Sequence, residues 1–99
     1  MDSYNIPSRL AFEVIHMALK DLKGRDPEYR QQALNWIQDK ELDPYISFKS
    51  ACDVLQWGHE RVAKGILVAY EKNELKKVIS TLHKVYSLQN RKRTYKRTS

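Results

Sequence analysis

Cysteine, glycine and long apolar runs are all scarce in this chain, and each shortage excludes a class of protein. Cys52 is the only cysteine among 99 residues, so no disulfide can form within the chain, as is typical of a reducing compartment. No apolar run approaches the roughly 20 residues that span a bilayer, and the first residues lack the pattern of a secretory signal. We therefore expect a soluble protein of the cytoplasm (bacterial cytoplasm or nucleoid) with no membrane partner.

The residues that usually carry catalysis or bind metals are also sparse. The histidines His16, His59 and His83 are far apart in the sequence, and one cysteine completes no zinc-binding set. With three glycines there is no glycine-rich phosphate loop, and no catalytic serine motif is present. The sequence therefore predicts no metal, no cofactor and no enzymatic activity, with Cys52 a small packing residue.

What the chain does contain is a helical pattern. Apolar residues make up 41% of it and include two tryptophans, enough for one modest core in a single domain. Apolar positions recur at intervals of three and four throughout, and no segment alternates as a strand does. We expect an all-α fold, a compact bundle of about five helices, with residues 1–90 as one helical domain and residues 91–99 as a flexible basic tail.

Local signals set the expected helix limits. Gly24 should end the first helix in a left-handed conformation, while Asp26 caps the second and Pro27 occupies its first position. Tyr29 should face inward with Ala33. Tyr45 and Ile46 should be buried beside the third helix, which Ser47 caps. The helices are expected at about residues 8–23, 27–38, 48–56, 59–72 and 73–89.

Positive charge is concentrated in the second half of the chain. The net charge of +6 divides into −2 for residues 1–59 and +8 for residues 60–99. Residues 91–99 alone hold five positive charges and no negative one. Such a segment is typical of an arm that binds a polyanion, and charge alone does not say which one.

Residues 48–70 have the spacing of two helices that cross steeply through a short turn. With Phe48 as the first position, the inward positions are all apolar: Ala51, Leu55, Trp57, Val62 and Ile66. Cys52 falls where the helices touch, and Gly58 can cap the second helix. The segment resembles the helix-turn-helix of small phage and bacterial transcription regulators. It departs from that pattern at Gln56, which replaces the usual turn glycine and must be left-handed, and at Gly65 inside the second helix, where close helix packing is one reason for a glycine.

The resemblance implies a DNA-reading surface at the start of the second helix. Its outward residues suit a major groove, since Lys64 can donate to guanine and Glu60 can accept from cytosine. The basic last helix and tail would then hold phosphates. The predicted DNA-binding residues are His59, Glu60, Arg61, Ala63, Lys64, Lys76, Lys77, Lys84, Arg91, Lys92, Arg93, Lys96 and Arg97. The alternative is that these residues only form a solvated surface.

Three functions remain open at this point. The first is a sequence-specific DNA-binding transcription regulator, phage-encoded or bacterial, with double-stranded DNA as partner. The second is a small factor that binds host RNA polymerase or another host protein. The third is RNA binding through the basic tail. The apolar stripe of the last helix is either a homodimer seam or the face that packs against the first helix.

Overall fold

The computed structural model describes the backbone of residues 6–40 and 46–98, with side chains up to Gln89. Within these ranges every regular element is a helix, which confirms the all-α prediction. The helices are α1 (Ser8–Lys23), α2 (Pro27–Ile37), α3 (Phe48–Leu55), α4 (His59–Glu71) and α5 (Leu75–Thr98). Tyr45 lies outside the described residues.

Capping residues fix where the helices begin. The Asp26 carboxylate accepts a hydrogen bond from the Glu28 amide at 2.9 Å, with Pro27 at the first position of α2. The Ser47 hydroxyl accepts one from the Ser50 amide at 3.1 Å at the start of α3. Each bond satisfies an amide that has no partner inside its helix. Both caps agree with the sequence prediction.

Three helices are followed by a non-glycine residue in the left-handed conformation, namely Asp39, Gln56 and Asn73. In each case the next amide bonds back to the carbonyl five residues earlier, as the Trp57 amide does to Cys52 at 2.9 Å. This is the Schellman arrangement, which satisfies carbonyls at a helix end. Gly24 does not follow the pattern. Its φ of −72° and ψ of 173° are extended, so the left-handed conformation expected for Gly24 is wrong.

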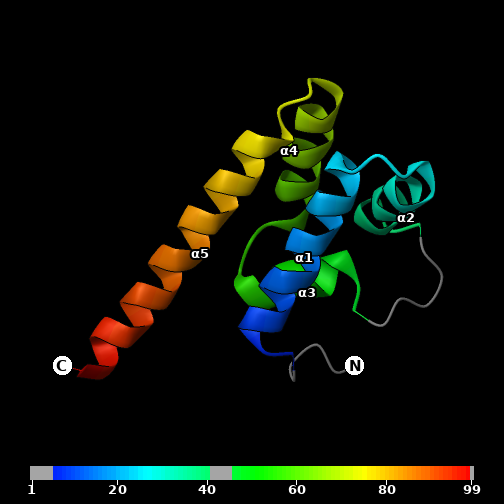
Figure 1. Ribbon diagram of the computed structural model, residues 1–99. Helices are drawn as coiled ribbons and strands as arrows, with labels where there is room; N and C mark the ends of the chain where they lie inside the picture. The colour runs from blue at the N-terminus through cyan, green and yellow to red at the C-terminus, as the bar shows by residue number, and fades with distance from the viewer. Residues whose placement is uncertain (1–5, 41–45, 99) are drawn as a thin grey trace.

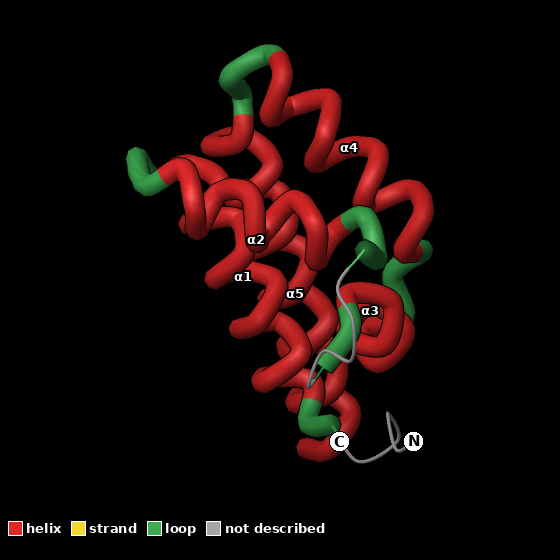
Figure 2. The backbone as a smooth tube through the Cα atoms, turned by 90° about the vertical axis from the view of Figure 1, so that its right-hand side faces the viewer, coloured by secondary structure: helices red, strands yellow, loops and turns green. Residues whose placement is uncertain are grey.

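α1 lies at the centre of the bundle, with α2 and α5 on opposite sides of it (Figures 1 and 2). α1 packs against both α2 and α5. The fully buried side chains Ile15 and Leu19 of α1 pack in one core with residues of all the other helices. Tyr29 was expected in this core, yet it is 56% exposed, because it lies in the first turn of α2 at the edge of the bundle.

α5 is the longest helix and stands furthest from the centre (Figure 1). It is attached through Tyr86, whose ring stacks on Phe12 of α1 with 4.3 Å between ring centroids. Its backbone is helical to Thr98, past the expected end near Gln89, and so includes residues assigned to the tail. The side chains of residues 90–99 are outside the described part, so the flexibility of the tail stays a prediction. None of the described helices is long and apolar enough to cross a membrane.

Candidate nucleic-acid interface

A three-residue turn joins α3 to α4 and sets the geometry of the candidate site. Gln56 has φ 62° and ψ 33°, the left-handed conformation that the spacing predicted at this position. Gly58 is the N-cap of α4 and contributes no side chain, so the cap prediction is also confirmed. Figure 2 shows α3 almost end-on while α4 runs along the picture, so the two helices cross steeply.

The inward positions of this unit are those that the spacing predicted. Ala51, Cys52 and Ile66 are all 0% exposed. Trp57 and Val62 are half-buried and pack against the same core. Burial raises the pKa of the Cys52 thiol to about 12, and Asp53 adds to the effect. Such a thiol stays protonated near neutral pH and is a poor nucleophile, consistent with a packing role.

Gln89 of α5 holds the turn from the other side, a contact that sequence reasoning did not find. The Trp57 indole donates to the Gln89 side-chain carbonyl at 3.1 Å. The Gln89 amide donates in turn to the Leu55 carbonyl at 3.0 Å. These two bonds place the point where the basic segment of α5 begins beside the turn that precedes α4.

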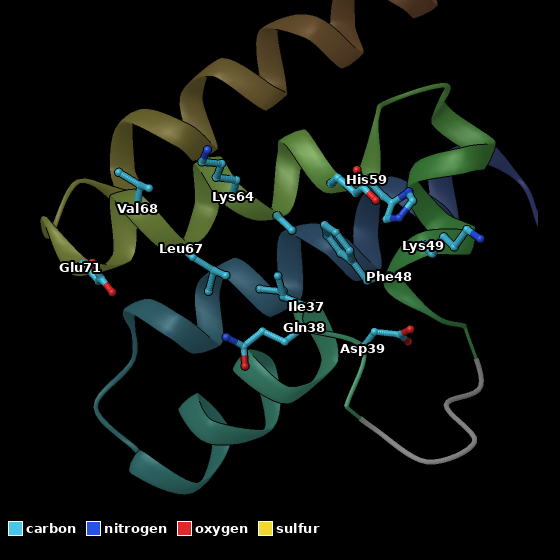
Figure 3. Close-up of a pocket in the computed structure, with 12 residues that line it drawn as sticks. Ile37, Gln38, Asp39, Phe48, Lys49, His59, Lys64, Leu67, Val68 and Glu71 are labelled. Atoms are coloured by element: carbon cyan, nitrogen blue, oxygen red, sulfur yellow. The ribbon is translucent and has the colours of Figure 1, made fainter.

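The predicted reading residues lie together on the outer face of α4. Glu60, Arg61 and Lys64 are exposed, while His59 and Ala63 are half-buried. All but Arg61 line a groove of about 500 Å³ between α4, the end of α2 and the start of α3. Figure 3 shows the side chains of His59 and Lys64 along this groove.

The groove has an apolar floor and a rim of both charge signs. Its apolar lining comes from Ile37, Phe48, Ala63, Leu67 and Val68. Lys49 and Lys64 are the lysines on the rim, and Asp39, Glu60 and Glu71 are the carboxylates. A surface of this kind is not dominated by positive charge. Any affinity for DNA at α4 must therefore draw on cations outside the groove.

The chain was compared with models of protein families, with curated proteins and with solved structures. None of these matches it. The function is therefore inferred from the residues themselves.

The predicted phosphate-contacting lysines of α5 are exposed, and they do not line the groove beside α4. Lys84 lies on α5 within about 8 Å of Gln89 along the helix axis, whereas Lys76 is about 20 Å away, at 1.5 Å per residue. Lys77 is paired with Glu74 at 4.0 Å. The side chains of Arg91, Lys92, Arg93, Lys96 and Arg97 lie outside the described residues.

Two histidines that are distant in the sequence meet between α1 and α5. The rings of His16 and His83 have centroids 4.8 Å apart in an edge-to-face arrangement. Burial, then His83, then Lys20 lower the pKa of His16, and Glu13 opposes them. In the part of the chain that the structure describes, no three histidine, cysteine or acidic side chains are grouped as a metal site.

The interior of α4 holds one further difference from expectation. Close helix packing was one reason expected for Gly65, yet a Cβ added to it would meet no atom within 4 Å. That explanation is wrong within this chain. A glycine in an exposed helix interior costs about 1 kcal/mol relative to alanine, and no contact in the described residues compensates.

Proposed function

We propose that the protein is a DNA-binding transcription regulator, of the kind found in phages and bacteria and acting in the cytoplasm or nucleoid. α3 and α4 form its helix-turn-helix, and the first turns of α4 read bases in a major groove. The observation that carries this proposal is the turn itself. A left-handed Gln56 costs energy, and it accompanies a steep crossing of α3 and α4 in which Glu60, Arg61 and Lys64 are exposed.

The reading residues have distinct chemical roles. Lys64 donates to guanine O6 or N7, Glu60 accepts from cytosine N4, and Ala63 contacts a thymine methyl. Phosphates are held by the basic end of α5, which begins at Gln89 beside the turn. We propose that a duplex read by the start of α4 is also contacted by the charges of residues 91–97. Base contacts then give the sequence preference, and phosphate contacts give most of the affinity.

The test begins with selection of bound sequences from a random DNA pool. On the selected site we expect Lys64→Ala to weaken binding by about 1–3 kcal/mol and to relax the preference at one base position. Lys72→Ala, at the far end of the same helix, is the matched control and should keep the preference. Equal weakening by Lys64→Ala on every sequence would make Lys64 a phosphate contact and would remove it from base reading.

A second candidate function is favoured by the apolar floor of the groove beside α4. Leu67 and Val68 follow the residues proposed to contact bases, and they line the same groove. An apolar side chain of another protein could pack against them. This is the small factor that binds host RNA polymerase or another host protein. If Val68→Asp abolishes activity in cells while the selected DNA is still bound normally, the protein-binding function is the correct one.

A further inference from the structure

A second cleft lies at the end of the bundle where α1 finishes, α2 begins and α4 turns into α5. Its volume is about 570 Å³. Lys23, Arg30 and Lys76 line it, together with Tyr70 and Asn73. The three cations come from three different helices, so only the fold brings them together. Neither Lys23 nor Arg30 belongs to the DNA-binding set that the sequence predicts.

The charge of this cleft is all of one sign. No aspartate or glutamate is among its lining residues. Among the residues that the structure describes, no carboxylate lies within 4 Å of a charged nitrogen of Lys23, Arg30 or Lys76. The acidic residue just before α5, Glu74, is directed to Lys77 at 4.0 Å. The cleft therefore differs from the groove beside α4, which is lined by both lysines and carboxylates.

Two features of the backbone prepare the cleft for an anion. The Arg30 guanidinium donates through Nη2 to the Gly24 carbonyl at 2.9 Å, which holds the side chain across the α1–α2 connection. On the opposite side, Asn73 is left-handed with φ 60°, and α5 begins two residues later at Leu75. The first amides of a helix lack partners within it and favour a negative group nearby.

We propose that this cleft is a binding site for a phosphate group. A phosphate carries close to two negative charges and several acceptor oxygens, which matches a cleft lined by three cationic residues and a tyrosine. Its source is either a free phosphorylated compound or the backbone of a nucleic acid, and the shared chemistry is the phosphate oxyanion. Lys76 then belongs to this cleft and not to the surface beside α4. The site does not depend on base reading by α4.

The probe for the first experiment is inorganic pyrophosphate, titrated at constant ionic strength while amide resonances are followed by NMR. We expect saturable shifts of the Gly24 and Asn73 amides. Lys23→Gln and Lys76→Gln should each weaken binding about tenfold, the loss expected for one charge-assisted contact. Lys49→Gln removes one exposed lysine from the groove beside α4 and should leave the affinity unchanged. All three lysines are exposed, so these variants should fold normally.

The second experiment distinguishes the two sources of phosphate. If a short duplex displaces pyrophosphate, and Lys23→Gln weakens duplex binding, the phosphate comes from a nucleic acid. If the duplex binds all variants equally while pyrophosphate binding is lost, the ligand is a small phosphorylated compound. Lys64→Ala should leave pyrophosphate binding intact, so a failure of base reading is separable from a failure of this site. Absence of saturable shifts, or equal weakening by all three glutamine variants, would overturn the proposal.

Discussion

His16 and His83 show how a contact made only in the folded chain changes the chemistry of a single residue. In the sequence neither has a partner at a useful spacing, whereas in the fold their rings meet edge to face and both lie near the ring of Phe12. A half-buried imidazole next to another imidazole is harder to protonate, because the charged form loses solvation and meets a second positive charge. The pKa of His16 is lowered for these reasons, with burial the larger cause.

This lowered pKa makes stability depend on pH. Because the folded pKa of His16 lies below its ordinary value of 6.5, the unfolded chain binds more protons between the two values. Stability contributed by His16 is therefore complete above about pH 6.5 and is lost as the pH falls through that window. We expect the melting temperature to drop on going from about pH 7.5 to about pH 5.5, and to drop less in His16→Gln.

His83→Gln is the second arm of that measurement. It removes the charge of the neighbouring ring but leaves His16 half-buried. On acidification, His83→Gln should therefore lose less stability than wild type and more than His16→Gln. Thermal melts of the three proteins at the same two pH values give the comparison. Identical pH dependence in wild type and both variants would show that the contact between the rings does not control protonation.

At the scale of the helices, the turn after α3 is the feature most open to a direct test. Gln56→Gly should leave stability unchanged or raise it by up to about 1 kcal/mol, because glycine adopts a left-handed conformation without steric cost. The gain is limited by the greater freedom of glycine in the unfolded chain. Gln38→Gly is the control, since Gln38 follows α2 with φ −87° and glycine there should destabilise. The free energies of unfolding come from chemical denaturation, and a clear loss in Gln56→Gly would contradict a strained turn.

The helices themselves could be predicted because their signals are local. Asp26 and Ser47 cap the next turn through atoms only two or three residues away, and the apolar spacing around Cys52 specifies one face of α3. Gln56 was predictable because the spacing allowed only a short turn. The extended conformation of Gly24 was not predictable, because its carbonyl accepts a hydrogen bond from Arg30 in another helix.

The candidate site was predictable only in part, for the same reason. The face of α4 follows from the helical period, so the exposure of Glu60 and Lys64 could be predicted. Contacts between distant segments leave no local pattern in the sequence. The spacing of residues therefore could not predict the hydrogen bond of Gln89 to the turn, or that Lys23 and Lys76 line the same cleft. Periodicity also misplaced Tyr29, because it gives the face of a helix but not where the neighbouring helix ends.

For the whole molecule, the main question is how positive charge is distributed along α5. From Leu75 to Thr98 the helix carries eight lysines and arginines and no acidic residue. Two side-by-side copies of α5 would bring these like charges together. Much of the apolar stripe of α5 already packs within the chain, since Leu75 is buried and Tyr86 stacks on Phe12. Val85 and Leu88 are the large apolar side chains of α5 that are exposed among the described residues. We therefore expect a polyanion to be a better partner for α5 than a second copy of α5. A regulator that acts as a dimer would need a contact elsewhere on the molecule.

Removal of residues 91–99 tests that role. The deletion keeps Gln89 and both of its hydrogen bonds to the turn, so the melting temperature should change little. It removes five positive charges, which could neutralise about 3–5 phosphates. Each phosphate contact on duplex DNA steepens the dependence of log affinity on log salt by about 0.9. The truncated protein should therefore bind all sequences more weakly, with a salt slope shallower by roughly 3–4 units.

Lys76→Gln in the full chain is the control for this deletion. It removes a charge at the other end of α5 and should change the slope by at most about one unit. The truncated protein should keep the base preference that we propose for Lys64, since the contacts expected of residues 91–99 are to phosphates. It should also keep its affinity for pyrophosphate, because the cleft at Lys23 and Lys76 is untouched. An unchanged salt slope after truncation would mean that residues 91–99 contact no phosphate, and DNA binding would then have to rest on the near-neutral face of α4 alone.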